Sequence, residues 1–412
     1  MQQHKPLTLR GNFSWTFAGN LVYAACQWGM LVILAKLGSP EMVGQFTLGL
    51  AITAPIIMFT NLQLRIVQAT DARKQYSFSD YLGLRLISTA LALAIITVIS
   101  LLGGFRWETS LVIFLMGLAK AFESISDIFH GLIQQHERMD RIATSLMIKG
   151  PLSLLLLGIG VYMSGHILWG VAGLVFAWAV VLVAWDIRSG ILMLYRSQLQ
   201  PRWHRKTLVK LVWLCLPLGF VMMLISLNTN IPRYFIERYL GERELGIFAA
   251  IAYLMVAGNI VVNALGESSI SRLAKYYAAK DAIAFHTLLL KLVGIAALLG
   301  GTGVLIAVVA GHQILTLLYQ PEYAEQTNLF IWLMVAAGIN YVSSFLSYGM
   351  TACQYFRIQM PLFATVVTIS TIACLLLLPS LGLLGVAIAL VIATIVQTIF
   401  SLGVIFYALH KL

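Results

Sequence analysis

Three charged side chains, Lys120, Glu123 and Asp127, lie in an otherwise apolar stretch between Gly117 and Gly131. At about 100° per residue, all three fall on one narrow face of a helix. A charge at the centre of a bilayer costs about 2.5 to 3.5 kcal/mol, so three unpaired charges would cost up to about 10 kcal/mol. We therefore expect these charges to face each other, another helix or water. A lysine there could hold an anionic group, and the carboxylates could take up a coupling proton or cation.

The composition places this face in a membrane protein. Of the 412 residues, 60% are hydrophobic and only 10% are charged, which is too apolar for a soluble globular protein of this size. The four cysteines, at 26, 215, 353 and 374, fall inside apolar runs without metal-ligand spacing. We expect no disulfide, metal or cofactor.

Apolar runs long enough to cross about 30 Å of hydrocarbon recur along nearly the whole chain. They predict an all-α polytopic membrane protein with about twelve transmembrane helices. The predicted spans are roughly 13–35, 43–66, 82–103, 110–134, 142–163, 167–194, 208–231, 246–270, 284–310, 327–353, 361–379 and 383–408. The first apolar stretch is too long for a signal-peptide core, so we expect it to be the first span.

The basic residues predict the orientation. With the N-terminus in the cytoplasm, most loop lysines and arginines lie inside, and those outside are Lys36, Arg106, Arg233, Arg238 and Arg243. This distribution satisfies the positive-inside rule and predicts that both termini are cytoplasmic. The net charge of +11 is then mainly a topology signal, with a secondary attraction to anionic membrane lipids, and it requires no nucleic-acid partner.

The two halves of the chain resemble each other. Leu37-Gly38 is followed by Gly44-Gln45-Phe46 after the first span, and Leu240-Gly241 by Gly246-Ile247-Phe248 after the seventh. Residues 113–116 and Gly131 match residues 331–334 and Gly349 at a constant shift of 218. We predict two parallel six-helix repeats that form two lobes, 1–195 and 208–412, around a central cavity. A basic cytoplasmic linker, 196–207, joins them.

The charged face belongs to the first half only. At the same shift, Lys120, Glu123 and Asp127 correspond to Gly338, Tyr341 and Phe345. Because the second copy manages with neutral residues, the helix architecture does not by itself require these charges.

Lys149 in the fifth predicted span reaches a depth similar to that of Lys120. One interpretation is a cavity whose lysines hold an anionic substrate, with Glu123 and Asp127 tuning the lysines or coupling to an ion. The other is a pair of structural salt bridges, Lys120 with Glu123 and Lys149 with Asp127. The sequence leaves both open.

Other polar residues are candidates for the cavity. Asn228 and Asn230 lie in the seventh span, and Gln27 is the repeat partner of Asn230; their amides could line a cleft or join helices. Further candidates are Asn61 and Arg65 near the inner end of the second span and Asn340 and Tyr341 in the tenth.

The remaining cations and the tryptophans have more ordinary explanations. Arg65, Arg85, Arg272 and Lys291 are expected to be topology charges or contacts to lipid phosphate. Arg233 is expected to snorkel to the outer interface. Trp178 is expected to be a packing or interface residue.

The two six-helix halves, the Leu-Gly and Gly-x-Phe turn after the first span of each half, the short loops and the basic linker resemble the Wzx-type polysaccharide flippases, including O-antigen flippases of lipopolysaccharide synthesis. These belong to the multidrug/oligosaccharidyl-lipid/polysaccharide exporter superfamily. The resemblance covers essentially the whole chain. It implies a protein of the bacterial cytoplasmic (inner) membrane that moves an undecaprenyl-diphosphate-linked oligosaccharide from the inner to the outer leaflet by alternating access, and that works beside a polysaccharide polymerase. Lys120 and Lys149 correspond by location to the family's intramembrane cations.

Two alternatives belong to other classes. A cation-coupled multidrug antiporter of the same superfamily would be expected to carry an acidic residue in the first span, yet residues 12–34 contain none; Glu123 and Asp127 could still serve. A membrane polysaccharide polymerase or ligase would be expected to carry a large external loop, whereas the external connections here are short.

Overall fold

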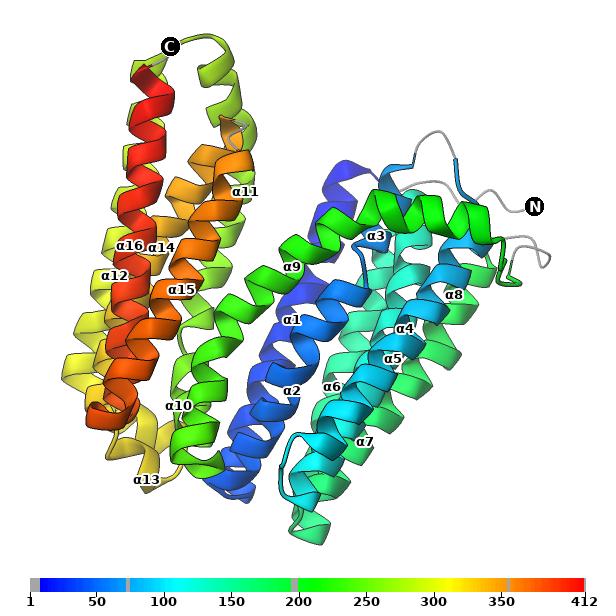
Figure 1. Ribbon diagram of the computed structural model, residues 1–412, viewed down its shortest axis with the longest axis horizontal. Coiled ribbons are helices and arrows are strands. Elements are labelled where there is room, and N and C mark those ends of the chain that lie inside the picture. The colour runs from blue at the N-terminus through cyan, green and yellow to red at the C-terminus, as the bar shows by residue number, and fades with distance from the viewer. Residues whose placement is uncertain (1–7, 72–74, 194–198, 354–355, 411–412) are drawn as a thin grey trace. The chain divides into compact units, whose positions relative to one another are not determined.

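A computed structural model of the chain describes residues 8–71, 75–193, 199–353 and 356–410. In these ranges every regular element is a helix (Figure 1). Both chain ends, Arg73, Lys74 and residues 196–198 of the predicted linker lie outside the described residues.

Ten of the described helices are long and apolar enough to cross a membrane, or eleven if the bent pair α10 (Glu242–Tyr253) and α11 (Val256–Ala278) forms one span. Helix α5 (Trp107–Gln135) has 29 residues, which is also long enough, but it carries the charged face. The all-α polytopic architecture is confirmed. A twelfth span formed by α5 stays a prediction.

The chain divides into two compact units, Met1–Ser226 and Leu227–Leu412, so helix α9 (Arg205–Leu240) contributes to both. The lobe limits predicted from the sequence stay a prediction. Besides α5 and the first part of α9, the first unit contains α1 (Leu9–Leu37), α2 (Pro40–Thr60), α3 (Leu64–Thr70), α4 (Phe78–Leu102), α6 (Met139–Ser164), α7 (Ile167–Val181), the π-helix η1 (Leu182–Asp186) and α8 (Ile187–Ile191).

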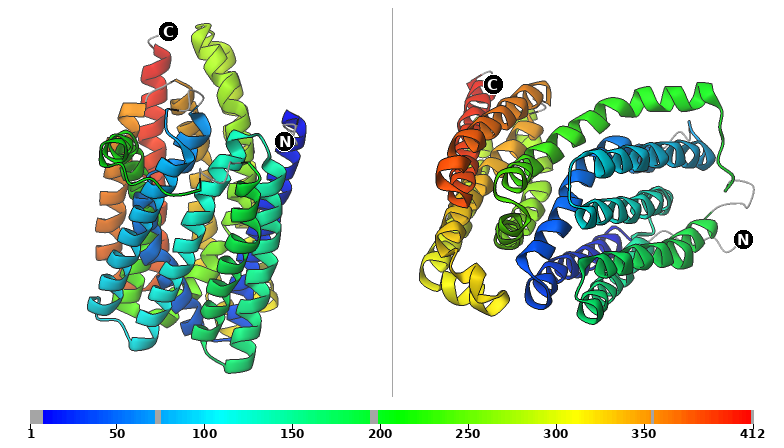
Figure 2. Two further views of the ribbon diagram at one scale, coloured as in Figure 1. Left: turned by 90° about the vertical axis from the view of Figure 1, so that its right-hand side faces the viewer. Right: turned by 60° about the horizontal axis from the view of Figure 1, so that its bottom comes forward.

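The second unit contains the rest of α9, the pair α10 and α11, and five further helices. These are α12 (Ala282–Leu318), α13 (Pro321–Ala324), α14 (Thr327–Ala352), α15 (Phe356–Leu381) and α16 (Leu383–His410). The helices within each unit lie side by side as a bundle (Figure 2).

The same packing order occurs within each unit. In the first unit α4 and α7 pack on α5, and α6 packs on α7; in the second, α12 and α16 pack on α14, and α15 packs on α16. The second span is interrupted in both, between α2 and α3 and between α10 and α11. This agreement supports the internal duplication inferred from the sequence.

The interruption in the first unit places a polar side chain beside a buried arginine. Leu62 and Gln63 both adopt a left-handed φ of 51°, a conformation that costs energy in residues other than glycine and persists where surrounding contacts hold it. Here Leu62 and Leu64 belong to a buried apolar cluster with residues of α4, α5 and α9. Asn61, in the same turn, accepts a hydrogen bond from Nη1 of Arg85.

The second unit uses the position equivalent to Lys120 for a close helix crossing. A Cβ atom added to Gly300 of α12 would lie 2.5 Å from the Cα of Gly338 in α14. Gly338 is therefore a packing residue, which explains why the second repeat carries no side chain at this position.

We expect Gly300→Ala to destabilise the second unit by about 1 to 3 kcal/mol, because the added methyl group must push two backbones apart. The neighbouring Gly301→Ala is the matched control, since its Cβ would meet open space. Thermal unfolding in detergent should separate the two variants. Equal midpoints would show that the crossing is not tightly packed.

Candidate functional site

Helix α5 carries a polar stripe longer than the sequence analysis proposed. Lys120, Glu123 and Asp127 share one face, and His130 and Gln134 continue it at the same spacing of three or four residues. The spacing of His130 and Gln134 was the signal that could have included them. Each side chain of the stripe contacts a side chain of another helix or of a nearby residue on α5. These contacts form three groups.

The first group, the lysine–tryptophan cluster, consists of Lys120, Glu123, Tyr23, Lys149 and Trp178. Lys120 Nζ lies 2.8 Å from Glu123 Oε2, and the Tyr23 hydroxyl donates to Glu123 Oε1 at 3.2 Å. The two lysine ammonium groups lie 5.0 Å and 5.5 Å from the centre of the Trp178 ring, within cation–π range. Trp178, only 2% exposed, thus contacts both lysines, a role that the sequence analysis missed.

Four helices hold this cluster. Gly150 of α6 lets α1 approach closely, since a Cβ there would lie 3.1 Å from Cys26 Cβ and 3.4 Å from Tyr23 Cα. The Trp178 indole N–H donates to Ser153 Oγ at 2.8 Å, which fixes the ring of α7 against α6. Gln27 lies one turn beyond Tyr23 on α1 and is half-buried.

Lys149 differs from Lys120 in having no bonded counter-ion. The residue is 1% exposed, and its Nζ has no hydrogen-bonding or ion-pairing partner among the described residues. Lys120 makes the bonded ion pair with Glu123, so the Lys149 ammonium is attracted to Glu123 and Asp186 only at longer range and has no direct ion pair among the described residues. Such a group is costly unless an anion binds it.

The second group, the arginine–aspartate network, corrects the predicted partner of Asp127. Its carboxylate lies 3.1 Å from Arg85 Nη2 and 3.4 Å from Arg65 Nη1, and not beside Lys149. Arg65 also donates from Nε to Gln134 at 3.1 Å. Arg85 is completely buried, so the expectation that it is a topology charge or a lipid contact was wrong. The predicted site residues Asn61 and Arg65 both belong to this network.

The third group is a buried pair, His130 and Asp186, whose Nε2 and Oδ1 atoms lie 3.1 Å apart. Asp186 ends the π-helix η1, a type of helical irregularity that often turns a side chain toward a functional position. The sequence analysis missed this pair. The contact joins α5 to η1 at the C-terminal half of the stripe.

The predicted polar residues of the second unit have different surroundings. Asn228 and Asn340 line a cavity within that unit, and Asn230 accepts a hydrogen bond from Arg233 Nη1 at 2.9 Å. Tyr341 is 5% exposed, and its hydroxyl donates to the carbonyl of Met255, where α10 and α11 are interrupted. Arg233 lines the same cavity as Asn228, which differs from the expected snorkelling side chain. Arg272 and Lys291 are exposed, as expected of topology charges.

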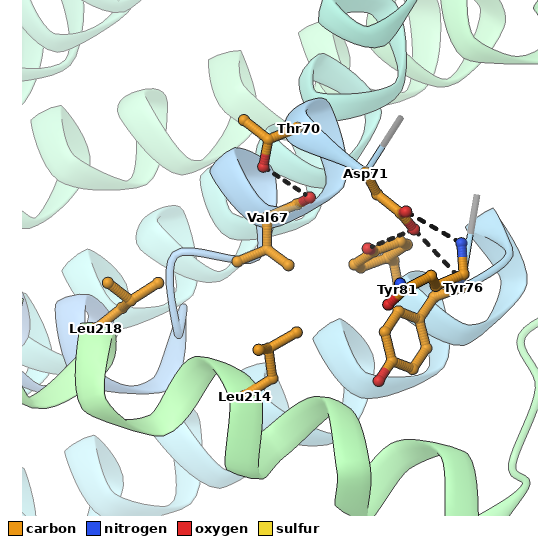
Figure 3. A pocket seen from close by; sticks show the side chains of 8 residues that line it. Val67, Thr70, Asp71, Tyr76, Tyr81, Leu214 and Leu218 are labelled. Atoms are coloured by element: carbon orange, nitrogen blue, oxygen red, sulfur yellow. Dashed lines mark hydrogen bonds between the residues drawn. The ribbon is translucent and has the colours of Figure 1, made fainter. Parts of the chain in front are cut away.

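A separate pocket of about 430 Å³ lies where α3 ends and α4 begins (Figure 3). The Asp71 carboxylate accepts hydrogen bonds from the backbone N–H groups of Gln75 and Tyr76 and from the Tyr81 hydroxyl. These bonds close the turn into α4, so Asp71 is explained by local structure. The pocket is lined by Val67, Thr70, Asp71, Gln75, Tyr76, Tyr81, Leu214 and Leu218.

Comparisons with known proteins add sequence relatives to this description. The sequence model of a family described as polysaccharide biosynthesis protein matches residues 9–276. The capsular polysaccharide biosynthesis protein CapF of Staphylococcus aureus is 31% identical over 401 residues, which cover 94% of this chain and 97% of CapF.

Solved structures share the fold at low sequence identity. An inward-facing MATE family multidrug resistance transporter of the MOP superfamily has a TM-score of 0.75 and 16% identity, over 96% of this chain and 99% of the transporter. The lipid II flippase MurJ, in an inward closed conformation, has a TM-score of 0.72 and 13% identity, over 97% of this chain and 89% of MurJ. At these identities the likeness is one of fold.

Proposed function

The chain belongs to the family of polysaccharide biosynthesis proteins, and we propose that it is a flippase for a lipid-linked oligosaccharide. The resemblance to a polysaccharide flippase-type family that was noted from the sequence is confirmed. The proposed substrate is an undecaprenyl-diphosphate-linked oligosaccharide, which is moved from the cytoplasmic to the outer leaflet for surface polysaccharide synthesis.

The observation that carries this proposal is the buried ammonium group of Lys149, which makes no direct ion pair among the described residues. It is buried beside Trp178 without a bonded carboxylate, while Lys120 lies on the same ring and already neutralises Glu123. A diphosphate has acceptor oxygens and negative charge that suit such a cation in a low-dielectric site. Amides such as Gln27, Asn228 and Asn340 offer donors and acceptors to sugar hydroxyl groups, and the prenyl chain can remain in lipid.

The remaining features of the proposal follow from topology. The basic loops support a cytoplasmic membrane location with both termini inside. The repeated packing of the two units suits a mechanism in which the repeats move relative to each other and expose the site to each side in turn. The flipped product would pass to polysaccharide polymerase machinery.

A cation-coupled multidrug antiporter is the second candidate, because the fold is also that of a MATE family transporter. The coupling residues would then be Glu123 and Asp127. Both carboxylates are held by cations of this chain, Glu123 by Lys120 and Asp127 by two arginines, and this favours the flippase.

Reconstituted vesicles test the two candidates directly. We expect purified protein to accelerate transfer of a fluorescent undecaprenyl-diphosphate-linked oligosaccharide between leaflets, compared with protein-free vesicles, and not to export a cationic dye against its gradient. If the lipid-linked sugar crosses at the same rate with and without protein while the dye is exported, the antiporter is correct.

A further inference from the structure

The second unit contains a cavity of about 290 Å³ that is lined by both polar and apolar side chains. This volume is near the lower end of ligand pockets, which are about 300 to 1,000 Å³, so it suits a single sugar residue better than a whole oligosaccharide. Five helical segments line it, from α9, the interrupted pair α10 and α11, α14, α15 and α16.

Four amide side chains face this cavity without protein partners. Asn228, Asn259, Asn340 and Gln397 make no side-chain hydrogen bonds within the part of the chain that the structure describes. Gln397 is only 9% exposed. Polar groups so placed are normally satisfied by protein, water or ligand. Amides both donate and accept, which matches the hydroxyl groups of a sugar.

Arg233 gives the cavity a positive charge. Its only hydrogen-bonding partner among the described residues is the neutral side chain of Asn230, which is 4% exposed and holds the guanidinium in place. None of the described residues that line the cavity is an aspartate or a glutamate. The guanidinium therefore keeps donors for an anionic group, and its fork geometry fits a carboxylate or a phosphate.

We propose that this cavity binds one acidic, carboxylate-bearing sugar residue of the substrate, with Arg233 on the carboxylate and the four amides on the hydroxyl groups. The proposal rests on the flippase function proposed above and narrows its substrate class. A cationic drug would be repelled by Arg233, and the single arginine offers less charge to a diphosphate than the paired lysines of the first unit do.

Binding to the purified full-length protein in lipid nanodiscs tests the assignment. The probes are two undecaprenyl-diphosphate-linked disaccharides that differ only in the terminal sugar, glucuronic acid or glucose. We expect the wild-type protein to bind the acidic probe at least about tenfold more tightly, the value of one charge-assisted contact. Arg233→Gln should remove this preference and leave the affinity for the neutral probe within about twofold.

Three further variants separate recognition from folding. Arg233→Lys should retain part of the preference, because it keeps the charge but loses the fork. Arg238→Gln, an exposed arginine on the same helix, should behave as the wild type does. Asn340→Leu should weaken the binding of both probes. The proposal is overturned if the wild type shows no preference or binds neither probe, or if Arg233→Gln weakens the binding of both probes equally.

The vesicle transfer assay tests the flippase function separately from the sugar site. A protein that prefers the acidic probe but moves neither probe between leaflets would refute the flippase and retain the sugar site. A protein that moves both probes at equal rates and binds them equally would retain the flippase and refute the sugar site.

Discussion

Replacing Lys149 with methionine is expected to reduce transport of the lipid-linked oligosaccharide by roughly a hundredfold, the effect of losing one buried charged contact to an anion. The same variant should be at least as stable as the wild type. The Lys149 ammonium is buried and has no bonded carboxylate in the described residues, so the resting protein bears its desolvation cost without an ion pair to offset it. Methionine keeps the length and apolar contacts of the side chain. The lost cation–π contact with Trp178 is worth about 0.5 to 2 kcal/mol and offsets part of the gain.

The measurement has two parts, transfer between leaflets in vesicles and the midpoint of thermal unfolding. Lys210→Met is the matched control, because Lys210 is exposed on α9 and should leave both quantities unchanged. Wild-type transport by Lys149→Met would remove this residue from the site. A strong loss of stability would instead make Lys149 a structural residue.

Lys120 should behave differently, because it neutralises Glu123. Lys120→Met would remove the ion pair of that carboxylate and leave the Tyr23 hydroxyl as its bonded partner among the described residues, with Lys149 acting only at longer range. The substitution that spares stability at position 149 should therefore lower it at position 120. The two variants therefore distinguish Lys149, the proposed anion-binding lysine, from Lys120, which forms an ion pair within the protein.

The helices could be predicted from the lengths of the apolar runs. The predicted helix limits lie close to the observed ones where loop-forming residues follow the run. The prediction of 110–134 corresponds to α5, Trp107–Gln135, and 82–103 to α4, Phe78–Leu102. The seventh span was placed at 208–231, yet α9 continues to Leu240, because Arg233 faces a polar cavity and does not end the helix. The interruption after Tyr253 has no proline at it, and the Met255 carbonyl at this point accepts hydrogen bonds from the Asn259 N–H and from the Tyr341 hydroxyl of another helix.

The contacts of the candidate site likewise divide into those that the sequence could predict and those that it could not. The pairing of Lys120 with Glu123 could be predicted because both residues lie on one helix, three positions apart. The partner of Asp127 could not, because it depends on how α4 and α5 are rotated against each other, and Arg85 is 42 positions away in the chain. Trp178 was expected to be a packing residue, since no sequence spacing shows that lysines from α5 and α6 meet on its ring.

Asp127→Asn is expected to destabilise the first unit by about 3 kcal/mol, the lower end of the range for breaking a buried ion pair. Arg85 is completely buried and would keep its charge without a carboxylate, while Arg65 and Asp127 are about 31% and 27% exposed and are partly screened by solvent. Glu322→Gln is the matched control. It removes a carboxylate from an ion pair with Arg243 in which both side chains are more than 40% exposed, so its cost should stay below about 1 kcal/mol.

The double variant Arg85→Met/Asp127→Leu decides whether Asp127 is structural or couples transport to an ion. It removes both charges together, so no buried cation is left unpaired, and stability should return most of the way to the wild-type value. Because Asp127 is already bound by two arginines, we expect the double variant to transport the lipid-linked oligosaccharide at close to the wild-type rate per folded molecule. A variant that is stable but inactive would contradict this expectation and would place the arginine–aspartate network in the transport cycle, as an ion-coupling role for Asp127 requires.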